Sequence, residues 1–522
     1  MFSRMLLAVI VAAALTVPPL GGRSISTSHE ARFALLARDI VERGAWFEPR
    51  VGGEVYRNKP PLYPWSIAAL SLPGGRVTEA TAQAPVVAAA LGAILFTFLL
   101  GAALFGARAG LWGALILLTG YDFFAHSQLL LPDMLVVAFV TAAAYFFWRA
   151  RDDPPARGAL AAFYGALAMG VFAKGPVGLL PLLVAAVWLW SEHGPRGLRR
   201  LWSPLGIGLF AGVTALWLGP FLSLGGRSFA QDVLQTDWLD WFVGIPSRGE
   251  LKELAIEGVL GFMPWALVAP LALWTGVRDR PTPAVRFVLL WFLVPLLLIT
   301  LSSNPRARYL LPIHPAGALL IAWWAETHGA TRATAGRLLG WMALAGALVA
   351  LAIPAWLRPS PAYFAPGFSW MALPLAAGAI MIGVAMVLGL RAGRPALLVY
   401  GAAGGMALIL GYGVWPYNAW VNETQSFRPV ASRLAEHARG VDAAMFVNRR
   451  FFQVEFYAGR EMRQIRTAHE LTEYLARPER PVVLVNESYW EEQREKFPPD
   501  VRILDEIRAG TERMLIVRLS KG

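Results

Sequence analysis

Long apolar stretches separated by short polar segments recur along most of this 522-residue chain. Many of them extend over about 17–22 residues, which as a helix can cross the ~30 Å hydrocarbon core of a bilayer. The pattern therefore predicts a polytopic α-helical membrane protein. The thirteen predicted spans cover residues 4–22, 82–105, 109–121, 134–150, 159–173, 176–191, 203–223, 256–276, 286–302, 309–325, 338–357, 371–390 and 396–416.

The polar connections between these spans alternate in character. One set is short and rich in arginine, and the positive-inside rule places it in the cytoplasm. Its members are Arg108; Arg149, Arg151 and Arg157; Arg196, Arg199 and Arg200; Arg278, Arg280 and Arg286; Arg332 and Arg337; and Arg391 and Arg394. The N-terminus is then cytoplasmic, and an odd number of spans leaves the C-terminal segment outside. No convincing small-x-small cleavage motif follows the first apolar stretch, so we interpret it as an uncleaved span.

The pattern changes near Ser426, where apolar spans give way to shorter elements. FRPVASRLAEHARG has the periodicity of an amphipathic helix that ends at Gly440. Strand-like segments follow (AAMFVNRR, REMRQIR, PVVLVNES, DVRILDEI and RMLIVRL), with helical HELTEYLA and YWEEQREKF between them. We therefore predict a membrane domain over residues 1–421 and a small extracytoplasmic α/β domain over 422–522.

Composition supports the membrane assignment and narrows the chemistry. Hydrophobic residues make up 56% of the chain and charged residues 16%, against about 25% in soluble domains. Cysteine is absent, which excludes disulfides and thiol chemistry. The formal net charge of +12 is mostly arginine and is largely explained by the cytoplasmic loops. No motif points to a nucleic-acid partner.

The first predicted outer loop, residues 23–81, contains two helical patterns. Thr27 to Glu30 fits a capping box, and Gly44 is placed to end the helix that follows. Lys59 and two prolines introduce a second apolar helix. Two interfacial helices in one loop would form a platform at headgroup depth, where an enzyme would meet a lipid-linked substrate.

Each polar residue singled out so far also has a purely structural interpretation. Glu30 and His29 would then serve only to cap the first helix of the loop. The basic residues of the loop would anchor it at the interface. Asp133 would cap the span that starts at Met134, although a carboxylate at that depth is costly unless it is paired or functional.

Several motifs occur in the order found in GT-C membrane glycosyltransferases, and the chain resembles that superfamily over roughly residues 1–325. The most similar patterns are those of bacterial 4-amino-4-deoxy-arabinose lipid A transferases and protein O-mannosyltransferases. The matching segments are His29-Glu30-Ala31-Arg32-Phe33, Gly44-Ala45-Trp46, Asn58-Lys59-Pro60-Pro61-Leu62, Pro132-Asp133-Met134, Lys174-Gly175-Pro176, Gly261-Phe262-Met263-Pro264-Trp265 and Arg308-Tyr309-Leu310-Leu311-Pro312.

The resemblance implies an inverting transfer of a sugar from a polyprenyl-phosphate donor to a lipid, glycan or protein acceptor. It implies a GT-C fold in the bacterial inner membrane, with catalysis on the outer face. The departing phosphate needs cations and the acceptor hydroxyl a carboxylate that orients or deprotonates it. The candidate phosphate-binding residues are Lys59, Arg32, Lys174, Arg306, Arg308 and Tyr309, and the candidate catalytic residues are Asp133, Glu30 and His29.

Three departures from the family pattern leave parts of the chemistry open. His29 stands where the family has its usual candidate base, an aspartate, so His29, Glu30 and Asp133 remain alternatives for that role. Asn58 and Thr236-Asp237 replace residues associated with a divalent metal, which argues against a metal cofactor without settling it. Asp122, His126, Asp237 and Asp240 could form another site, but their spacing carries no metal signature.

Two other functions compete with the transferase. A secondary transporter or lipid flippase predicts ionisable residues in mid-span, whereas most charges here lie at the ends of spans. A polyprenyl-phosphate-binding scaffold without transfer activity would explain the departures at His29 and Asn58. The sequence identifies neither the sugar nor the acceptor.

Overall fold

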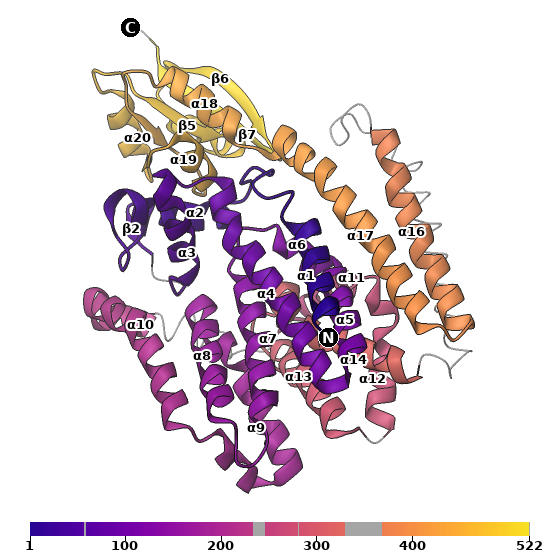
Figure 1. The fold of residues 1–522 in the computed structure, drawn as a ribbon. Coiled ribbons are helices and arrows are strands. Elements are labelled where there is room, and N and C mark those ends of the chain that lie inside the picture. The colour runs from indigo at the N-terminus through magenta and orange to yellow at the C-terminus, as the bar shows by residue number, and fades with distance from the viewer. Residues whose placement is uncertain (57–58, 233–245, 280, 329–367, 521–522) are drawn as a thin grey trace. The chain divides into compact units, whose positions relative to one another are not determined.

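The computed structural model describes residues 1–56, 59–232, 246–279, 281–328 and 368–520 (Figure 1). These residues form two compact units. The first contains residues 1–20, 57–63 and 83–416, and the second contains residues 21–56, 64–82 and 417–522. Most of the loop that follows the first apolar helix thus belongs to the same unit as the C-terminal residues.

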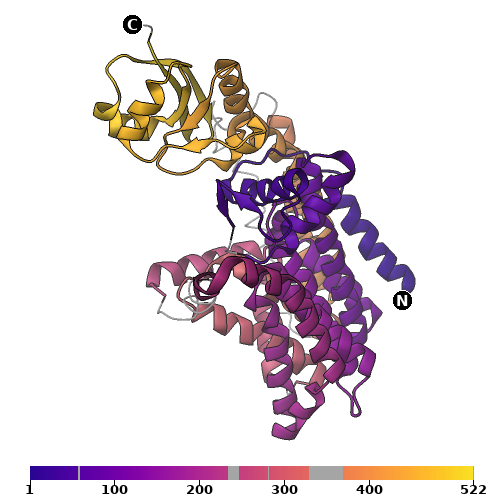
Figure 2. The ribbon, with the colours of Figure 1, turned by 90° about the vertical axis from the view of Figure 1, so that its left-hand side faces the viewer.

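The first unit is helical, as the apolar pattern predicts (Figures 1 and 2). Its α-helices are α1 (Phe2–Thr16), α4 (Glu79–Phe105), α5 (Ala107–Leu118), α6 (Tyr121–Ser127), α7 (Asp133–Ala150), α8 (Arg157–Lys174), α9 (Leu180–His193), α10 (Pro204–Asp232), α11 (Arg248–Gly261), α12 (Ala269–Arg278), α13 (Pro283–Thr300), α14 (His314–His328), α16 (Phe368–Arg391) and α17 (Pro395–Trp420). Short 3₁₀ helices lie at Pro176–Leu179, Pro195–Leu201, Trp265–Leu267 and Ala307–Ile313.

Five described helical segments are long and apolar enough to cross a membrane, or six if a bent pair counts as one span. They are Glu79–Phe105, Asp133–Ala150, Pro176–His193, Pro283–Thr300 and Pro395–His437, and the bent pair is Pro195–Leu201 with Pro204–Pro220. The multi-pass character is confirmed, but the count of thirteen is not. The predicted span 338–357 lies outside the described residues. The predicted span 256–276 is divided, because α11 ends at Gly261 and α12 starts at Ala269.

The first-loop portion of the second unit confirms the two predicted helices. Helix α2 (Ser28–Arg43) begins after Thr27, whose hydroxyl accepts from the Glu30 amide, and ends at Gly44 with φ +68°. A two-stranded hairpin, β1 (Arg50–Val51) and β2 (Glu54–Val55), follows. Helix α3 (Leu62–Ser71) comes next, and its N-terminal residues belong to the first unit.

The C-terminal portion of the second unit is the predicted α/β fold. Its five-stranded sheet has the order β4-β3-β5-β7-β6, with β4, β3 and β5 parallel and β7 and β6 antiparallel. The strands are β3 (Ala443–Met445), β4 (Arg463–Gln464), β5 (Val482–Asn486), β6 (Val501–Ala509) and β7 (Glu512–Leu519), and the helices are α18 (Arg428–His437), α19 (Phe452–Ala458), α20 (Ala468–Leu475) and α21 (Glu487–Gln493).

Alternate residues of β5 face two separate cores. Val482 and Leu484 pack with the cluster that includes α18 and α19, whereas Val483 and Val485 pack with the cluster that includes α20 and α21. Both faces of the sheet are therefore covered by helices, as the continuous apolar run PVVLV requires.

Candidate functional site

A buried ion pair joins two of the predicted site residues in the first unit. Asp133 is the first residue of α7 and Lys174 is the last residue of α8. The two helices are adjacent in the chain and pack against each other, so these positions meet at the same end of the pair. Lys174 Nζ lies 2.5 Å from Asp133 Oδ1, with the side chains 15% and 6% exposed.

Two residues of the Ala307–Ile313 segment extend this pair into a cationic and aromatic group. Lys174 Nζ lies 4.8 Å from the centre of the Tyr309 ring, and the Arg308 guanidinium lies 5.5 Å from it. Arg308 and His126 add favourable electrostatic interactions to the Asp133 carboxylate. Arg308 Nε is buried and has no hydrogen-bond partner among the described residues, whereas other atoms of this side chain line the polar pocket described next.

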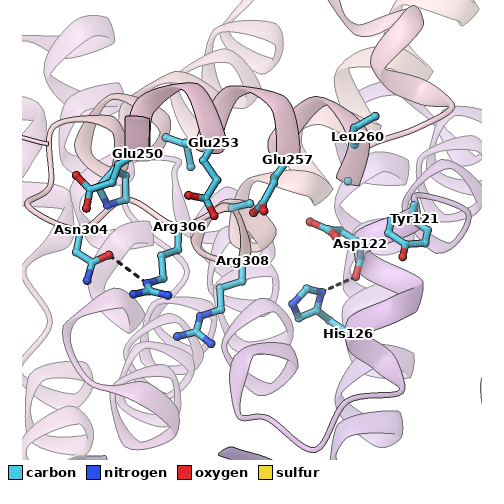
Figure 3. Close-up of a pocket in the computed structure, with 14 residues that line it drawn as sticks. Tyr121, Asp122, His126, Glu250, Glu253, Glu257, Leu260, Asn304, Arg306 and Arg308 are labelled. Carbon is cyan, nitrogen blue, oxygen red and sulfur yellow. Dashed lines mark hydrogen bonds between the residues drawn. The ribbon is translucent and has the colours of Figure 1, made fainter. Parts of the chain in front are cut away.

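A polar pocket of about 670 Å³ is lined by Arg308 together with residues of α6, α11 and the segment 304–307 (Figure 3). Arg306 also lines it and donates from Nε to Asn304 Oδ1 at 3.1 Å. Figure 3 shows Arg306 and Arg308 on one side of the pocket and the acidic face of α11 on the other. That face consists of Glu250, Glu253 and Glu257. The pocket can therefore bind a ligand that carries both anionic and hydrogen-bonding groups.

Asp122 and His126 complete the lining of this polar pocket from α6. Burial raises the pKa of Asp122, although the nearby His126 partly opposes the shift. The His126 ring nitrogen Nδ1 lies 2.9 Å from the backbone carbonyl oxygen of Asp122, which holds the ring in place. The two remaining members of that predicted cluster, Asp237 and Asp240, lie outside the described residues. Across the described parts of the chain, no three His, Asp or Glu side chains are grouped to hold a metal ion.

The acidic face of α11 was not predicted from the sequence. Glu257 falls inside the predicted span 256–276, whereas the structure ends α11 at Gly261 and turns the chain there. The signal that could have revealed it is the spacing of Glu250, Glu253 and Glu257, which places three carboxylates on one helical face.

Lys59 belongs to the first unit, as do Asp133, Lys174, Arg306, Arg308 and Tyr309. Its side chain is half-buried just before α3. His29, Glu30 and Arg32 belong instead to the second unit. The structure thus assembles Asp133, Lys174, Arg308 and Tyr309 locally, and Arg306 shares a pocket with Arg308.

Glu30 is held by an ion pair with Arg23, a residue that the sequence did not single out. The two side chains are 1% and 5% exposed. A Glu30 carboxylate oxygen also accepts from the Thr27 hydroxyl at 3.1 Å. This arrangement fixes the start of α2, and it gives the carboxylate a structural role that a free base would not have.

The other two candidates of the second unit differ from Glu30 in exposure. The His29 side chain is exposed at the start of α2. Arg32 is half-buried, and its guanidinium lies 5.4 Å from the Phe452 ring and 5.9 Å from the Tyr56 ring. Arg38, on the same helix, donates to the carbonyl oxygen of Glu455 at 3.0 Å. Arg32 of the loop motif and Arg38 therefore both contribute to packing between α2 and α19.

Comparison with known proteins gives two kinds of similarity in sequence. Residues 30–229 match the family described as dolichyl-phosphate-mannose-protein mannosyltransferase. The chain is also 26% identical over 367 residues to the undecaprenyl phosphate-alpha-4-amino-4-deoxy-L-arabinose arabinosyl transferase of Pectobacterium carotovorum. It is 27% identical over 369 residues to the protein of that name from Aeromonas salmonicida. Each alignment covers 66% of this chain and 64% of the relative.

Solved structures show the same fold over nearly the whole chain. ArnT from Cupriavidus metallidurans bound to undecaprenyl phosphate aligns with a TM-score of 0.81 at 19% identity, covering 98% of this chain and 97% of that one. The oligosaccharyltransferase AglB from Archaeoglobus fulgidus aligns with a TM-score of 0.55 at 10% identity, covering 95% and 70%. This chain is therefore a multi-pass, mainly helical membrane protein with the GT-C fold, and it resembles the aminoarabinose transferases and the protein mannosyltransferases.

Proposed function

We propose that the protein is a glycosyltransferase that moves a sugar from a polyprenyl-phosphate donor to a lipid, polysaccharide or protein acceptor. We place the reaction at the outer face of the bacterial inner membrane, with the N-terminus cytoplasmic and the C-terminal α/β domain extracytoplasmic. The names of the sequence relatives support an undecaprenyl phosphate-linked donor. The bound lipid of the structurally similar ArnT supports the same class of carrier.

The observation that carries this proposal is the group formed by Asp133, Lys174, Arg308 and Tyr309 beside a polar pocket. It combines a buried carboxylate with two cations at the ends of helices. Leaving-group phosphate requires positive charge that is already in place when negative charge develops. An acceptor hydroxyl requires an oxygen that can orient it or take its proton.

In the proposed step, the acceptor oxygen attacks the anomeric carbon while the bond from that carbon to the phosphate oxygen breaks. The bonding electrons leave with the polyprenyl phosphate, and the acceptor proton passes to a carboxylate. Attack from the face opposite the phosphate inverts the anomeric carbon. Lys174 and Arg308 stabilise the departing phosphate, and we assign Arg306, Lys59, Arg32 and Tyr309 to the same donor site from the motif resemblance.

Asp133 is the best-supported candidate for the proton-accepting or orienting carboxylate. Glu30 is also buried and paired, but its partner Arg23 is not a candidate ligand and the pair fixes the start of α2, whereas the partner of Asp133 is Lys174, a candidate phosphate ligand. His29 is exposed at the start of α2, and imidazole is a common general base, which keeps it as the second candidate. We do not propose a metal-dependent step.

Transfer of radiolabelled sugar in membranes tests the proposal directly. Membranes with wild-type protein, supplied with a panel of polyprenyl-phosphate sugars, are expected to form a labelled lipid or polymer product. Asp133→Asn should abolish most of this transfer, whereas Asp152→Asn is the matched control, because that exposed carboxylate follows the other end of α7. Absence of transfer from every donor, with the carrier lipid still bound, would favour a scaffold instead.

The same assay separates the remaining candidates for the base. His29→Ala should retain transfer if Asp133 acts on the acceptor. Loss of transfer in His29→Ala at wild-type expression, together with retention in Asp133→Asn, would assign the base role to His29. A product that survives in both variants would require a third group.

A further inference from the structure

His126, on α6, has one ring nitrogen that is held by a hydrogen bond. Its Nδ1 lies 2.9 Å from the backbone carbonyl oxygen of Asp122. A carbonyl oxygen can only accept a hydrogen bond, so Nδ1 must carry the hydrogen of this contact. In the neutral ring the lone pair is then on Nε2. The backbone of α6 therefore selects the tautomer in which Nε2 can accept a proton.

The other nitrogen, Nε2, is open to the polar pocket. It has no hydrogen-bond partner within the described parts of the chain, and it is not one of the polar atoms there that are sealed from solvent, as Arg308 Nε is. Figure 3 shows the half-buried His126 ring pointing from α6 into the pocket. The exposed side chains of Glu253 and Glu257 also line this pocket, so solvent reaches it.

The Asp133 carboxylate, by contrast, has little contact with solvent. Its side chain is 6% exposed and is paired with Lys174. If it takes the acceptor proton, the ion pair with Lys174 is restored only when that proton leaves. Lys174, His126 and Arg308 all act electrostatically on this carboxylate. Of these three side chains, the ammonium and guanidinium groups have no lone pair, whereas imidazole Nε2 can accept a proton.

We propose that His126 relays the proton of each turnover from Asp133 to solvent in the polar pocket. This inference rests on the sugar transfer proposed above and adds the step that follows it. The proton moves from the Asp133 carboxyl oxygen to Nε2, directly or through one water molecule, and leaves a carboxylate and an imidazolium. The imidazolium then gives the Nε2 proton to water and keeps the Nδ1 hydrogen on the Asp122 carbonyl oxygen. Both side chains are thereby returned to their initial state.

Two variants separate the roles of the two ring nitrogens. In His126→Asn, the side-chain amide can still donate to the Asp122 carbonyl oxygen, as Nδ1 does, but no basic nitrogen remains. In His126→Ala, both nitrogens are removed, and a pocket of about 670 Å³ admits free imidazole. His469→Asn is the matched control, because His469 is 84% exposed in the C-terminal portion of the second unit.

The purified full-length protein is assayed with radiolabelled donor in two ways, with enzyme in excess and with donor in excess. We expect His126→Asn to complete the first turnover at the wild-type rate, because Asp133 still takes the acceptor proton. With donor in excess, later turnovers should slow by about 10²-fold, because Asp133 retains that proton. Added imidazole should restore most of the loss in His126→Ala. His469→Asn should behave as the wild type in both assays.

Three results would overturn the relay. An unchanged rate of His126→Asn with donor in excess would show that Nε2 is not needed. A first turnover slowed as much as the later ones would place His126 in the bond-breaking step or in the fold. A His126→Ala variant that imidazole does not restore would exclude a small base as the missing group. Imidazole rescue carries the test even if His126→Asn does not fold.

The failure of the relay and the failure of the proposed function give different results. Wild-type protein that forms no labelled product in the first turnover would refute the sugar transfer, and the relay with it. Wild-type protein that turns over repeatedly, beside an equally active His126→Asn, would refute the relay alone.

Discussion

The ion pair between Arg23 and Glu30 makes a quantitative prediction about the start of α2. Replacing Glu30 by leucine removes the carboxylate and leaves the Arg23 guanidinium, which is 5% exposed, without its counter-charge. Removal of one partner from a buried pair costs about 3–5 kcal/mol, because an uncompensated charge remains in a poorly hydrated environment. Replacement of both partners by apolar residues of similar volume is often neutral, because no charge is left to desolvate.

The number of residues in the second unit allows this energy to be expressed as a change in melting temperature. The unit comprises roughly 160 residues, for which 1 kcal/mol corresponds to about 2–4 °C. Glu30→Leu should therefore lower the transition of this unit by roughly 6–20 °C. The double variant Arg23→Met/Glu30→Leu should recover most of the loss. Glu436→Leu is the control, since the Arg433–Glu436 pair is exposed and its loss should leave the transition nearly unchanged.

Thermal unfolding of the purified protein in detergent, combined with the transfer assay, checks the reasoning. A Glu30→Leu variant that melts with the wild type would refute the structural role of the pair. A double variant no more stable than Glu30→Leu would show that the loss comes from another contact. If the double variant is stable but inactive while Asp133→Asn retains activity, Glu30 would have to be the base after all.

The remaining predictions concern the first unit. Asp133→Asn should lower the rate of sugar transfer by about 10²–10⁴-fold in the radiolabel assay, and an unchanged rate would remove Asp133 from the mechanism. Lys174→Met should impair both transfer and melting temperature, because it leaves Asp133 buried without its cation, whereas Lys174→Arg should retain the fold. The pKa of Asp122 is raised in the fold, so its contribution favours folding below the unfolded pKa and is lost as pH rises through the folded pKa. Asp122→Asn should flatten this dependence when melting curves are recorded at increasing pH from below the ordinary pKa of aspartate. Ser247→Ala breaks the capping box with Glu250 and should cost about 1 kcal/mol of helix stability, visible as faster amide exchange in the first turn of α11 but not of α13.

Local patterns in the sequence were sufficient for many elements of the fold. Apolar runs identified the helical membrane region, and the capping residues at Thr27 and Gly44 marked the ends of α2. Alternation and turn residues identified the C-terminal α/β segment, including all five strands of its sheet. These features depend on neighbours in the chain, so periodicity and capping chemistry report them directly.

The sequence alone is least informative where a single apolar stretch forms two separate helices in the structure. Residues 256–276 have the composition of a span, yet the chain breaks between Gly261 and Ala269 and turns three glutamates of α11 toward a polar pocket. The composition of a sequence window averages the apolar and acidic faces of such a helix. It therefore does not reveal that the two faces differ. Which face meets which neighbour depends on packing against α13 and α14, which lie later in the chain.

For the candidate site, too, the sequence determined some features and the tertiary structure determined others. Motif order identified Asp133, Lys174, Arg308 and Tyr309 as residues of interest, because their types and positions at span ends are visible in the sequence. Only the tertiary structure decided that Lys174 pairs with Asp133, that Arg23 takes up the Glu30 carboxylate, and that His314 is buried with an unmatched nitrogen. Partners of a charge or of a buried polar atom are chosen by distance in space, and residues 41 positions apart, as in the Asp133–Lys174 pair, leave no periodic signal in the sequence.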